Sequence, residues 1–240
     1  MSNSRAILKG RSSLCRGTTC LSFEKPDGFA FKPGQFANFT IDSAIATDAG
    51  GNTRTLSIAS APHEKDLMVA MRMRDTGFKR AVEALPIGAP FLLEGPYGNL
   101  VLHRNATRPA VFLAGGIGIT PFRSMIWHAK EVGSAHTISL FYSIRRIEEG
   151  AFLGELREAE ELNPRFRFIP TITQSDGIPS HWQGELGHIN KSMLMKWVPD
   201  FQAPIFYIAG PPGMVAGMRQ ILDEAGVSDD DIRAEEFAGY

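Results

Sequence analysis

The chain has 240 residues, enough for one large domain or two modest ones, and its 43% hydrophobic and 21% charged content is ordinary for a globular protein. The formal net charge of -1 argues against a protein attracted to nucleic acid or to an anionic membrane by overall charge. A local basic patch remains open, because Arg72, Arg74, Lys79 and Arg80 lie close together in the sequence.

The apolar runs predict neither a targeting segment nor a membrane span. Residues 1–10 hold no apolar core of the length that a signal peptide needs. The longest apolar run, around residues 110–122, is shorter than the roughly 20 residues of a membrane helix. We therefore expect a soluble, cytoplasmic protein.

The cysteines and histidines predict no metal centre. Cys15 and Cys20 are the only cysteines, too few for an iron–sulfur cluster held by four thiolates. Their spacing predicts two unpaired structural thiols on one strand, with a disulfide left open. The six histidines are scattered without the spacing of metal ligands.

The first hundred residues predict a small β-barrel. Apolar runs at 36–41, 54–59 and 66–73 are separated by turns rich in glycine, proline, aspartate and asparagine. One helix is expected, at Gly77–Ala84, ended by Leu85 and Pro86. Residues 94–98 are expected to form a turn between domains, and the domain boundary is expected within 102–108.

From Pro109 onward the pattern changes to alternating strands and helices. Strands are predicted at 111–114, 137–142, 166–172 and 205–209, with helices at 121–131, 151–162 and 211–225. This alternation is typical of βαβ units and a mostly parallel sheet.

Residues 112–122 predict the end of a buried strand, a glycine turn, and a helix opened by Pro121. Glycines let the backbone approach a ligand, and the unpaired N–H groups of a helix start favour a phosphate. A tight turn with packing glycines fits the segment as well. The segment departs from the dinucleotide-binding pattern G-x-G-x-x-G, because Pro121 replaces the third glycine. That pattern also includes an acidic residue after the next strand, whereas this chain has Ser143, Arg145 and Arg146 there and no acid.

Three further motifs are weak when each is taken alone. Arg54 is placed to neutralise a pyrophosphate and Ser57 to donate to a ring nitrogen, but an ordinary surface arginine on a strand fits too. Thr76 to Lys79 precede the predicted helix and suggest either an anion site or a simple turn. Residues 208–214 predict a second strand–turn–helix crossing at the carboxyl edge of the sheet.

Taken in order, these motifs resemble the ferredoxin–NADP reductase superfamily of flavoenzymes over nearly the whole chain. They are P-G-Q-F at 33–36, R-x-L-S at 54–57, G-P-Y-G at 95–98, G-G-x-G-x-x-P at 115–121 and A-G-P-P-x-M at 209–214. The resemblance implies an N-terminal antiparallel β-barrel of ferredoxin-reductase type over residues 1–104, which binds FAD. It also implies a C-terminal α/β parallel-sheet domain over residues 105–240, which binds NAD(P)H.

For the flavin, the resemblance implies that Arg54 contacts the phosphates and that Ser57 lies near the flavin N5. Leu56 stands where the family usually has an aromatic residue against the isoalloxazine ring, so flavin affinity or redox potential is expected to differ. The implied flavin-binding residues are Arg54, Thr55, Leu56, Ser57, Gly77, Phe78 and Lys79.

For the coenzyme, the resemblance places NAD(P)H at the glycine loop and at the following strand ends. Ala209 stands where the family often has a cysteine near the nicotinamide. The implied coenzyme-binding residues are Gly116, Gly118, Thr120, Ser143, Arg145, Arg146, Gly210 and Pro211.

Two segments bear on the preference between NADPH and NADH. Ser143, Arg145 and Arg146 are suited to a 2′-phosphate, which favours NADPH over NADH. Against this, residues 174–176 lack the arginine that NADPH-specific relatives often carry at that place.

The C-terminus ends in aromatic residues, and family members often end with an aromatic packed near the flavin. Phe237 or Tyr240 is expected to play that part, the alternative being a frayed polar tail. We assign Ser57, Glu236 and Phe237 to the catalytic centre.

The implied function is an oxidoreductase that takes a hydride from NAD(P)H onto FAD and passes electrons to a separate one-electron carrier, such as ferredoxin or flavodoxin. One alternative is an NAD(P)H-dependent reductase of free flavin or of another small acceptor. The other alternative is a flavin-bearing electron-transfer subunit of a larger complex. No nucleic acid, metal or membrane span is expected.

Overall fold

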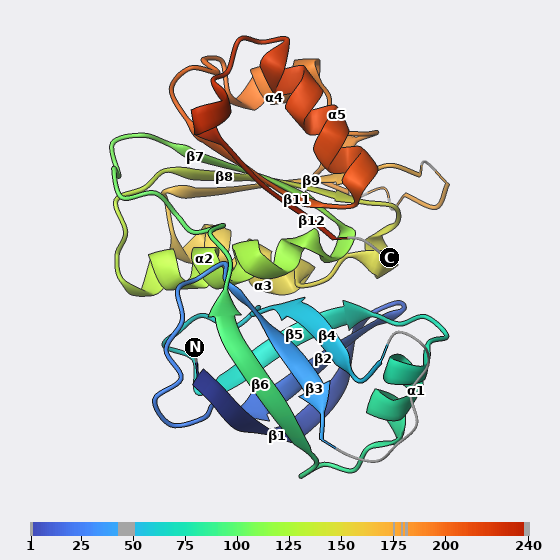
Figure 1. Cartoon of the computed structure of the whole chain (residues 1–240). Coiled ribbons are helices and arrows are strands. Elements are labelled where there is room, and N and C mark those ends of the chain that lie inside the picture. The colour runs from blue at the N-terminus through green and yellow to red at the C-terminus, as the bar shows by residue number, and fades with distance from the viewer. Residues whose placement is uncertain (1, 43–50, 175, 179, 181, 238–240) are drawn as a thin grey trace.

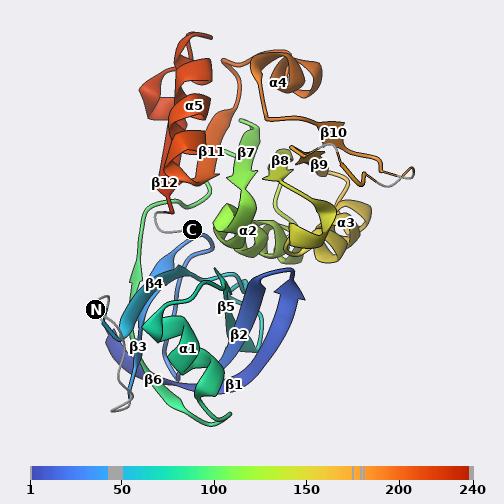
Figure 2. The same cartoon turned by 90° about the vertical axis from the view of Figure 1, so that its right-hand side faces the viewer.

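A computed structural model of the chain describes residues 2–42, 51–174, 176–178, 180 and 182–237 (Figure 1). Within these residues the strands form two six-stranded sheets, one from each half of the chain. Figures 1 and 2 show the two sheets as separate bodies packed against each other, with helices lying between and around them. Both predicted sheets are therefore present.

The first sheet is antiparallel throughout, with the strand order β4-β3-β6-β1-β2-β5. A bridge between Ile58, just after β4, and Val69 of β5 joins the two outer strands, so the sheet curls into a barrel. The helix α1 (Gly77–Ala84) has the predicted bounds and lies at one side of this barrel (Figure 2). The strands are β1 Ser2–Cys15, β2 Thr18–Glu24, β3 Phe36–Ile41, β4 Thr53–Ser57, β5 Asp66–Arg72 and β6 Pro90–Tyr97.

The barrel core is built from side chains that alternate along the strands, as in β3, where every second residue is buried, and it holds aromatic rings from three strands. Phe23, Phe39 and Phe91 are fully buried, and the ring centroid of Phe23 lies 5.2 Å from that of Phe39 and 5.0 Å from that of Phe91. Because successive side chains of a strand point to opposite faces, this alternation fixes which face turns inward.

Two predictions in the first half are wrong. Cys15 and Cys20 do not share a strand: Cys15 ends β1, Cys20 lies in the antiparallel neighbour β2, and the chain reverses at Gly17, whose φ of +70° suits glycine. Both thiols are free, as predicted. The expected turn at 94–98 is instead mostly strand, because an irregularity in the β3–β6 register lets Tyr97 of β6 pair with Phe36.

The second sheet is parallel throughout, with the strand order β10-β9-β8-β7-β11-β12. Every residue of β7 and of β11 is buried, as expected for central strands that are covered on both faces. The strands are β7 Ala110–Gly115, β8 Ile138–Ile144, β9 Phe166–Ile172, β10 Glu185–Leu186, β11 Ile205–Gly210 and β12 Ile232–Glu236.

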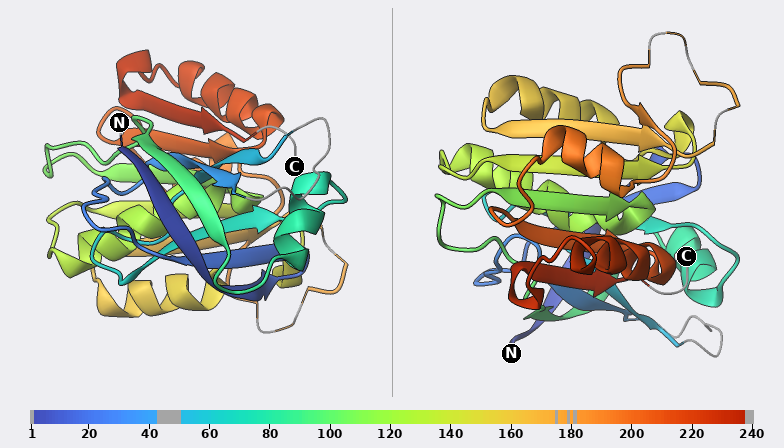
Figure 3. Two further views of the ribbon diagram at one scale, coloured as in Figure 1. Left: turned by 60° about the horizontal axis from the view of Figure 1, so that its bottom comes forward. Right: turned by 90° about the horizontal axis from the view of Figure 1, so that it is seen from above.

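Helices cover both faces of the second sheet. Figure 1 shows α2 and α3 on the face towards the barrel and α4 and α5 on the far face, and Figure 3 shows α4 and α5 in front of the strands when the molecule is viewed from above. The chain leaves β7 towards β8 on one side and returns to β11 on the other, so strand order reverses at β7. The helices are α2 Ile119–Glu131, α3 Leu153–Leu162, α4 Lys191–Trp197 and α5 Pro212–Asp223.

The start of α2 differs from the prediction. Residues Gly116–Gly118 form a short 3₁₀ turn and α2 begins at Ile119, so Pro121 is the third helical residue and not the first. Proline is accommodated there because the N–H groups of a first helical turn have no partner within the helix. The sequence analysis also did not predict β10, α4 or β12. None of the helices in the described ranges has the length and apolar character that a membrane crossing requires.

Arg123 of α2 holds the two halves together. Its side chain is 5% exposed and pairs with Glu64 of the first half, at 2.8 Å, and with Glu155 of α3, at 2.5 Å. It also donates to the Ala59 carbonyl oxygen at 2.8 Å, and the neighbouring Ser124 hydroxyl donates to the Ser60 carbonyl oxygen at 2.7 Å. A buried cation paired in this way is costly to separate from its partners, so the two halves are held in one arrangement.

Candidate functional site

A cavity of about 430 Å³ lies between the two halves, at the carboxyl ends of β7, β8, β9 and β11. We call it the sheet-edge cavity. In an open parallel sheet, ligands bind at this edge where the strand order reverses. Its lining residues are Arg72, Arg74, Gly115, Gly116, Ile117, Ser143, Ile144, Arg145, Glu149, Thr173, His188, Pro211, Met214 and Phe237.

The three glycines of the loop have different roles. Gly116 has a φ of +54°, and no atom lies within 4 Å of where its Cβ would be, so its backbone borders open space. A Cβ at Gly115 would come within 2.3 Å of the Met214 Sδ, and one at Gly118 within 2.1 Å of the Ala209 carbonyl oxygen. Gly116 is therefore available to a ligand, whereas Gly118 is required for packing because the atom in the way is backbone. At Gly115 the atom in the way belongs to the flexible Met214 side chain, and Gly115 itself lines the cavity.

Other residues predicted for the coenzyme are used within the fold. The Thr120 hydroxyl donates to the Ile117 carbonyl oxygen at 3.0 Å, and this side chain is 2% exposed, so it closes the turn. A Cβ at Gly210 would lie 3.2 Å from the Gly115 Cα, so Gly210 allows two strand ends to approach. Of the eight residues predicted for the coenzyme, the cavity is lined by Gly116, Ser143, Arg145 and Pro211.

The sheet-edge cavity is rich in arginine. Arg72 of β5 pairs with Glu149 at 2.6 Å, and this pair joins the first half to η2 (Ile147–Glu149) of the second. Within the described residues, Arg74 and Arg145 have no ion-pair partner. These two guanidinium groups leave the cavity with positive charge that suits a phosphorylated ligand.

Arg146 lies differently from Arg145. Its Nη2 is 2.7 Å from the Asp176 Oδ2, and hydrogen bonding to this guanidinium lowers the pKa of the Asp176 carboxyl below its usual value. The pair is exposed, and Arg146 does not line the cavity. The structure therefore separates the two adjacent arginines that the sequence analysis treated together.

A second group of cations lies at the start of α1. The Arg54 guanidinium carbon lies 4.7 Å from the ring centroid of the buried Phe78, and its Nη1 donates to the Gly51 carbonyl oxygen at 3.0 Å. Lys79 is buried, and its pKa is lowered by burial and by the charges of Arg74 and Arg54. Three cations near one helix start form an anion-binding arrangement.

The remaining residues of β4 are split between its two faces. Leu56 and Ser57 are buried, and Ser57 is the register partner of Phe36 on β3. The Thr55 hydroxyl donates to the Asn38 Oδ1 at 2.7 Å in an exposed position. The short strand β4 therefore carries both Arg54 and Ser57.

The end of the chain contributes Phe237 to the cavity. The Phe237 N–H donates to the Gly210 carbonyl oxygen at 2.9 Å, and the side chain lines the sheet-edge cavity. Glu236 is exposed and does not line it, so the structure does not bring this predicted catalytic residue to the site. Tyr240 lies outside the described residues.

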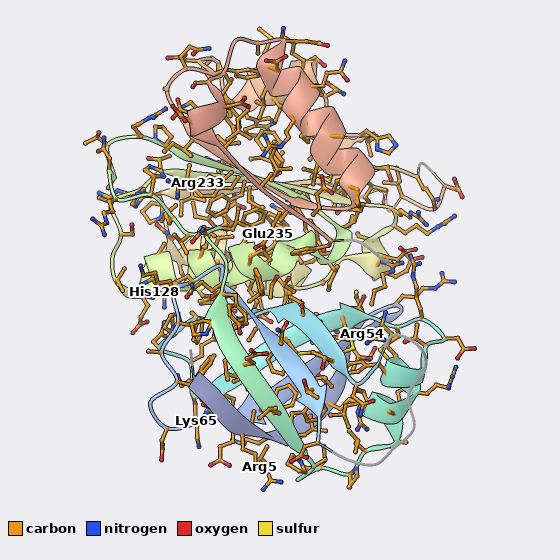
Figure 4. The ribbon with its side chains drawn as sticks, viewed as in Figure 1. Arg5, Arg54, Lys65, His128, Arg233 and Glu235 are labelled. Atoms are coloured by element: carbon orange, nitrogen blue, oxygen red, sulfur yellow. The ribbon has the colours of Figure 1, made fainter. Side chains whose placement is uncertain are left out.

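Glu235, to which the sequence patterns assigned no role, has a carboxyl whose pKa is raised. Figure 4 places Glu235 between the two sheets. Its Oε1 lies 3.3 Å from where a Cβ at Gly98 would be, and its Oε2 is buried with no hydrogen-bond partner among the described residues. Burial raises the pKa of this carboxyl to about 7.

Several cavity residues were not assigned to a ligand from the sequence. The sequence placed Arg72 and Arg74 only in a basic patch with Lys79 and Arg80, and both line the cavity. Lys79 lies instead at the start of α1, and Arg80 pairs with Asp75. In the described ranges no three His, Cys, Asp or Glu side chains are grouped so that they hold a metal ion. The unassigned cavity residues of the second half include Glu149, Thr173, His188 and Met214.

Comparison with known proteins gives one family match and many relatives. Residues 112–220 match the oxidoreductase NAD-binding domain family. The chain is 28% identical to the electron transfer component of anthranilate 1,2-dioxygenase of Acinetobacter baylyi, over 86% of this chain and 58% of that protein. It is 24% identical to the reductase component of propane 2-monooxygenase of Rhodococcus jostii, over 89% of this chain and 57% of that protein.

The whole fold matches solved structures. A ferredoxin NADP⁺ reductase of Neisseria gonorrhoeae with bound FAD and NADP superposes with a TM-score of 0.82 at 22% identity, covering 98% of this chain and 99% of that chain. The likeness extends over both halves, so the two-domain fold is shared. This chain spans a little over half the length of the two curated relatives described above.

Proposed function

We propose that this chain is a member of the ferredoxin–NADP reductase superfamily and a flavin-dependent NAD(P)H oxidoreductase that passes electrons to a separate acceptor. The observation that carries the proposal is the sheet-edge cavity, which is lined by the glycine loop of one half and by Arg72 and Arg74 of the other. We assign residues 1–104 to FAD binding and residues 105–240 to NAD(P)H binding.

The α1 cluster fits the pyrophosphate of FAD. Lys79 is buried beside Arg54 and Arg74, and its pKa is lowered by burial and by these neighbouring charges, so a bound anion would stabilise the charged form of Lys79. The positive end of the α1 helix dipole lies at the same place and favours an anion there. When bound, FAD would supply the conversion of a two-electron hydride transfer into single-electron steps.

The sheet-edge cavity fits the coenzyme. Gly116 offers backbone with no side chain in the way, and Arg145 offers a guanidinium without an acidic partner among the described residues. Because Arg146 is held by Asp176, Arg145 is the residue that we expect to carry the preference for NADPH over NADH. Replacing Arg145 by Gln should raise the KM for NADPH and leave that for NADH unchanged, while Arg146→Gln should change both little. Equal effects of Arg145→Gln on the two coenzymes would contradict the assignment.

Glu235 is the residue that we propose to hold a proton near the flavin, in place of Glu236. Burial raises the pKa of its carboxyl to about 7, and the carboxyl lies beside Gly98 and Phe36, the register partner of Ser57. A carboxyl whose pKa lies close to the working pH both accepts and releases a proton readily.

The acceptor is proposed to be a separate one-electron carrier such as ferredoxin or flavodoxin. Relatives named as an electron transfer component and as a reductase component support a chain that works with other proteins. The test is steady-state oxidation of NADH and of NADPH by the purified full chain with ferredoxin, flavodoxin, free flavin or no added acceptor. Turnover with a carrier protein is expected.

The other outcomes separate the alternatives. Steady turnover of free flavin with none of ferredoxin or flavodoxin would favour a reductase of small acceptors. Bound FAD without NAD(P)H oxidation under any condition would favour a non-catalytic electron-transfer subunit. A colourless protein that does not bind added FAD would contradict the proposal altogether.

A further inference from the structure

A second cavity, of about 780 Å³, also lies between the two halves. We call it the linker cavity, because residues 101–104, which follow β6, form one of its walls. None of its lining residues lines the sheet-edge cavity. Figure 4 shows two of them, His128 and Arg233, on the side of the molecule away from Arg54. The coenzyme and flavin sites therefore leave this cavity unused.

The interior of the linker cavity is mostly apolar. It is lined by Met125 and Ala129 of α2, by Val132 just after that helix, and by Val101 and Leu102 of the linker. Val132 is 58% exposed although it is an aliphatic residue, which is consistent with a place at the opening. A volume of several hundred cubic ångströms, an apolar lining and a position between domains are typical of small-molecule sites.

The polar groups of the linker cavity are cationic. Lys32 and Arg104 are exposed, and neither has an ion-pair partner among the described residues. Arg233 of β12 is fixed more firmly: its Nη1 donates to the Val101 carbonyl oxygen at 2.5 Å, and its guanidinium carbon lies 5.4 Å from the ring centroid of Tyr207. The described lining holds no aspartate or glutamate, so the charge of these three groups is not neutralised within it.

Of the two histidines that line the cavity, His128 adds hydrogen-bonding capacity without charge. His103 and His128 both line the cavity, and burial lowers the pKa of each below its usual value, so both are neutral at pH 7. Both ring nitrogens of His103 are used within the fold: Nδ1 lies 2.9 Å from the Tyr207 hydroxyl and Nε2 lies 3.0 Å from the Arg108 carbonyl oxygen. The Nδ1 of His128 has no hydrogen-bond partner among the described residues.

We propose that the linker cavity is a second ligand site, which binds a small organic anion with an apolar body, such as an aromatic or short acyl carboxylate. The apolar wall of α2 would take the body, and Lys32, Arg104 and Arg233 would face the anionic group. A nicotinamide dinucleotide suits it poorly, because the cavity offers no glycine loop for a pyrophosphate. The site is independent of the proposed oxidoreductase function.

The test uses a pair of fluorescent probes on the full, flavin-loaded chain. Anilinonaphthalene sulfonate has an apolar body and an anionic group, and N-phenylnaphthylamine has the same body without the charge. The sulfonate is expected to bind, and NADP⁺ at saturation is expected not to displace it. Displacement by NADP⁺, or the absence of sulfonate binding, would overturn the proposal.

Variants locate the site. Lys32→Glu combined with Arg104→Glu should weaken sulfonate binding about fivefold or more and leave the neutral probe unchanged, because two exposed charges are reversed. Lys65→Glu reverses an exposed lysine outside the cavity in the same half and should change neither probe. Val132→Glu should weaken both probes. Equal sulfonate binding by the double variant and the wild type would overturn the proposal. Equal losses of sulfonate binding for the double variant and for Lys65→Glu would also overturn it, because the dye would then bind elsewhere.

Discussion

Replacing Glu235 by glutamine should change how the stability of the protein depends on pH. Burial raises the pKa of Glu235 from 4.5 to about 7, so the folded protein holds this proton more tightly than the unfolded chain does. The contribution of this group to stability is therefore most favourable below about pH 4.5, declines as the pH rises to about 7, and is fully lost above that.

The magnitude follows from the pKa difference. At 1.36 kcal/mol for each unit, the difference between 4.5 and about 7 corresponds to at most about 3 kcal/mol of unfolding free energy. Glutamine keeps the size of the side chain but carries no charge. Glu235→Gln should therefore stabilise the protein by up to about 3 kcal/mol near pH 8 and by much less near pH 5.

Urea unfolding of the flavin-loaded chain at several pH values measures this difference. Glu236→Gln is the matched control, because Glu236 is the exposed neighbour on the same strand and should leave the pH profile unchanged. If the wild-type and Glu235→Gln profiles run parallel between about pH 5 and pH 8, the carboxyl of Glu235 does not titrate as the structure implies.

Three further outcomes are expected. Arg123→Met should destabilise the protein by about 3–5 kcal/mol in urea unfolding, because Glu64 and Glu155 lose their buried partner. An unchanged midpoint would show that Arg123 does not hold the two halves together. Lys79→Met should weaken FAD binding about tenfold or more in an equilibrium titration, since one charge-assisted hydrogen bond is lost; equal affinity would remove Lys79 from the flavin site. Gly116→Val should raise the KM for NAD(P)H about tenfold while flavin content stays constant, because valine is strained at a φ of +54° and its side chain enters the cavity. An unaltered KM would argue against coenzyme binding at this loop.

The sequence was most informative where a pattern is local and repeated. The alternation of apolar strands with helices after Pro109 predicted the parallel sheet, and α1 was predicted with its observed bounds. Short elements were missed, among them β10 with two residues, because so few positions carry no periodic signal. The close spacing of Cys15 and Cys20 was misleading: it placed both on one strand, although Gly17 reverses the chain between them.

The site shows the limit of sequence patterns more sharply. Gly116 and Gly118 look equivalent in the motif, yet one borders the cavity and the other packs against the Ala209 carbonyl oxygen. Such a difference depends on where β11 lies, which the motif does not contain. The pair of Arg72 and Glu149 is separated by 77 positions, so only the folded chain brings these side chains together.

The assignment of Glu236 depended on the phase of a strand. Successive residues of β12 point to opposite faces, so an error of one position exchanges an exposed carboxyl for a half-buried one. Glu235 has the buried carboxyl atom and the raised pKa, which are the features that we associate with a functional group. The sequence analysis did not predict β12, and so had no basis for choosing between the two glutamates.

Anaerobic addition of NADPH, and separately of NADH, to the purified chain tests the central claim most directly. The absorbance of the oxidised flavin is followed during the addition, and the released flavin is identified after denaturation. The account predicts bound FAD that is reduced by an equimolar amount of NAD(P)H and reoxidised by a one-electron carrier. Protein without flavin that does not bind added FAD, or bound FAD that neither coenzyme reduces, would contradict it.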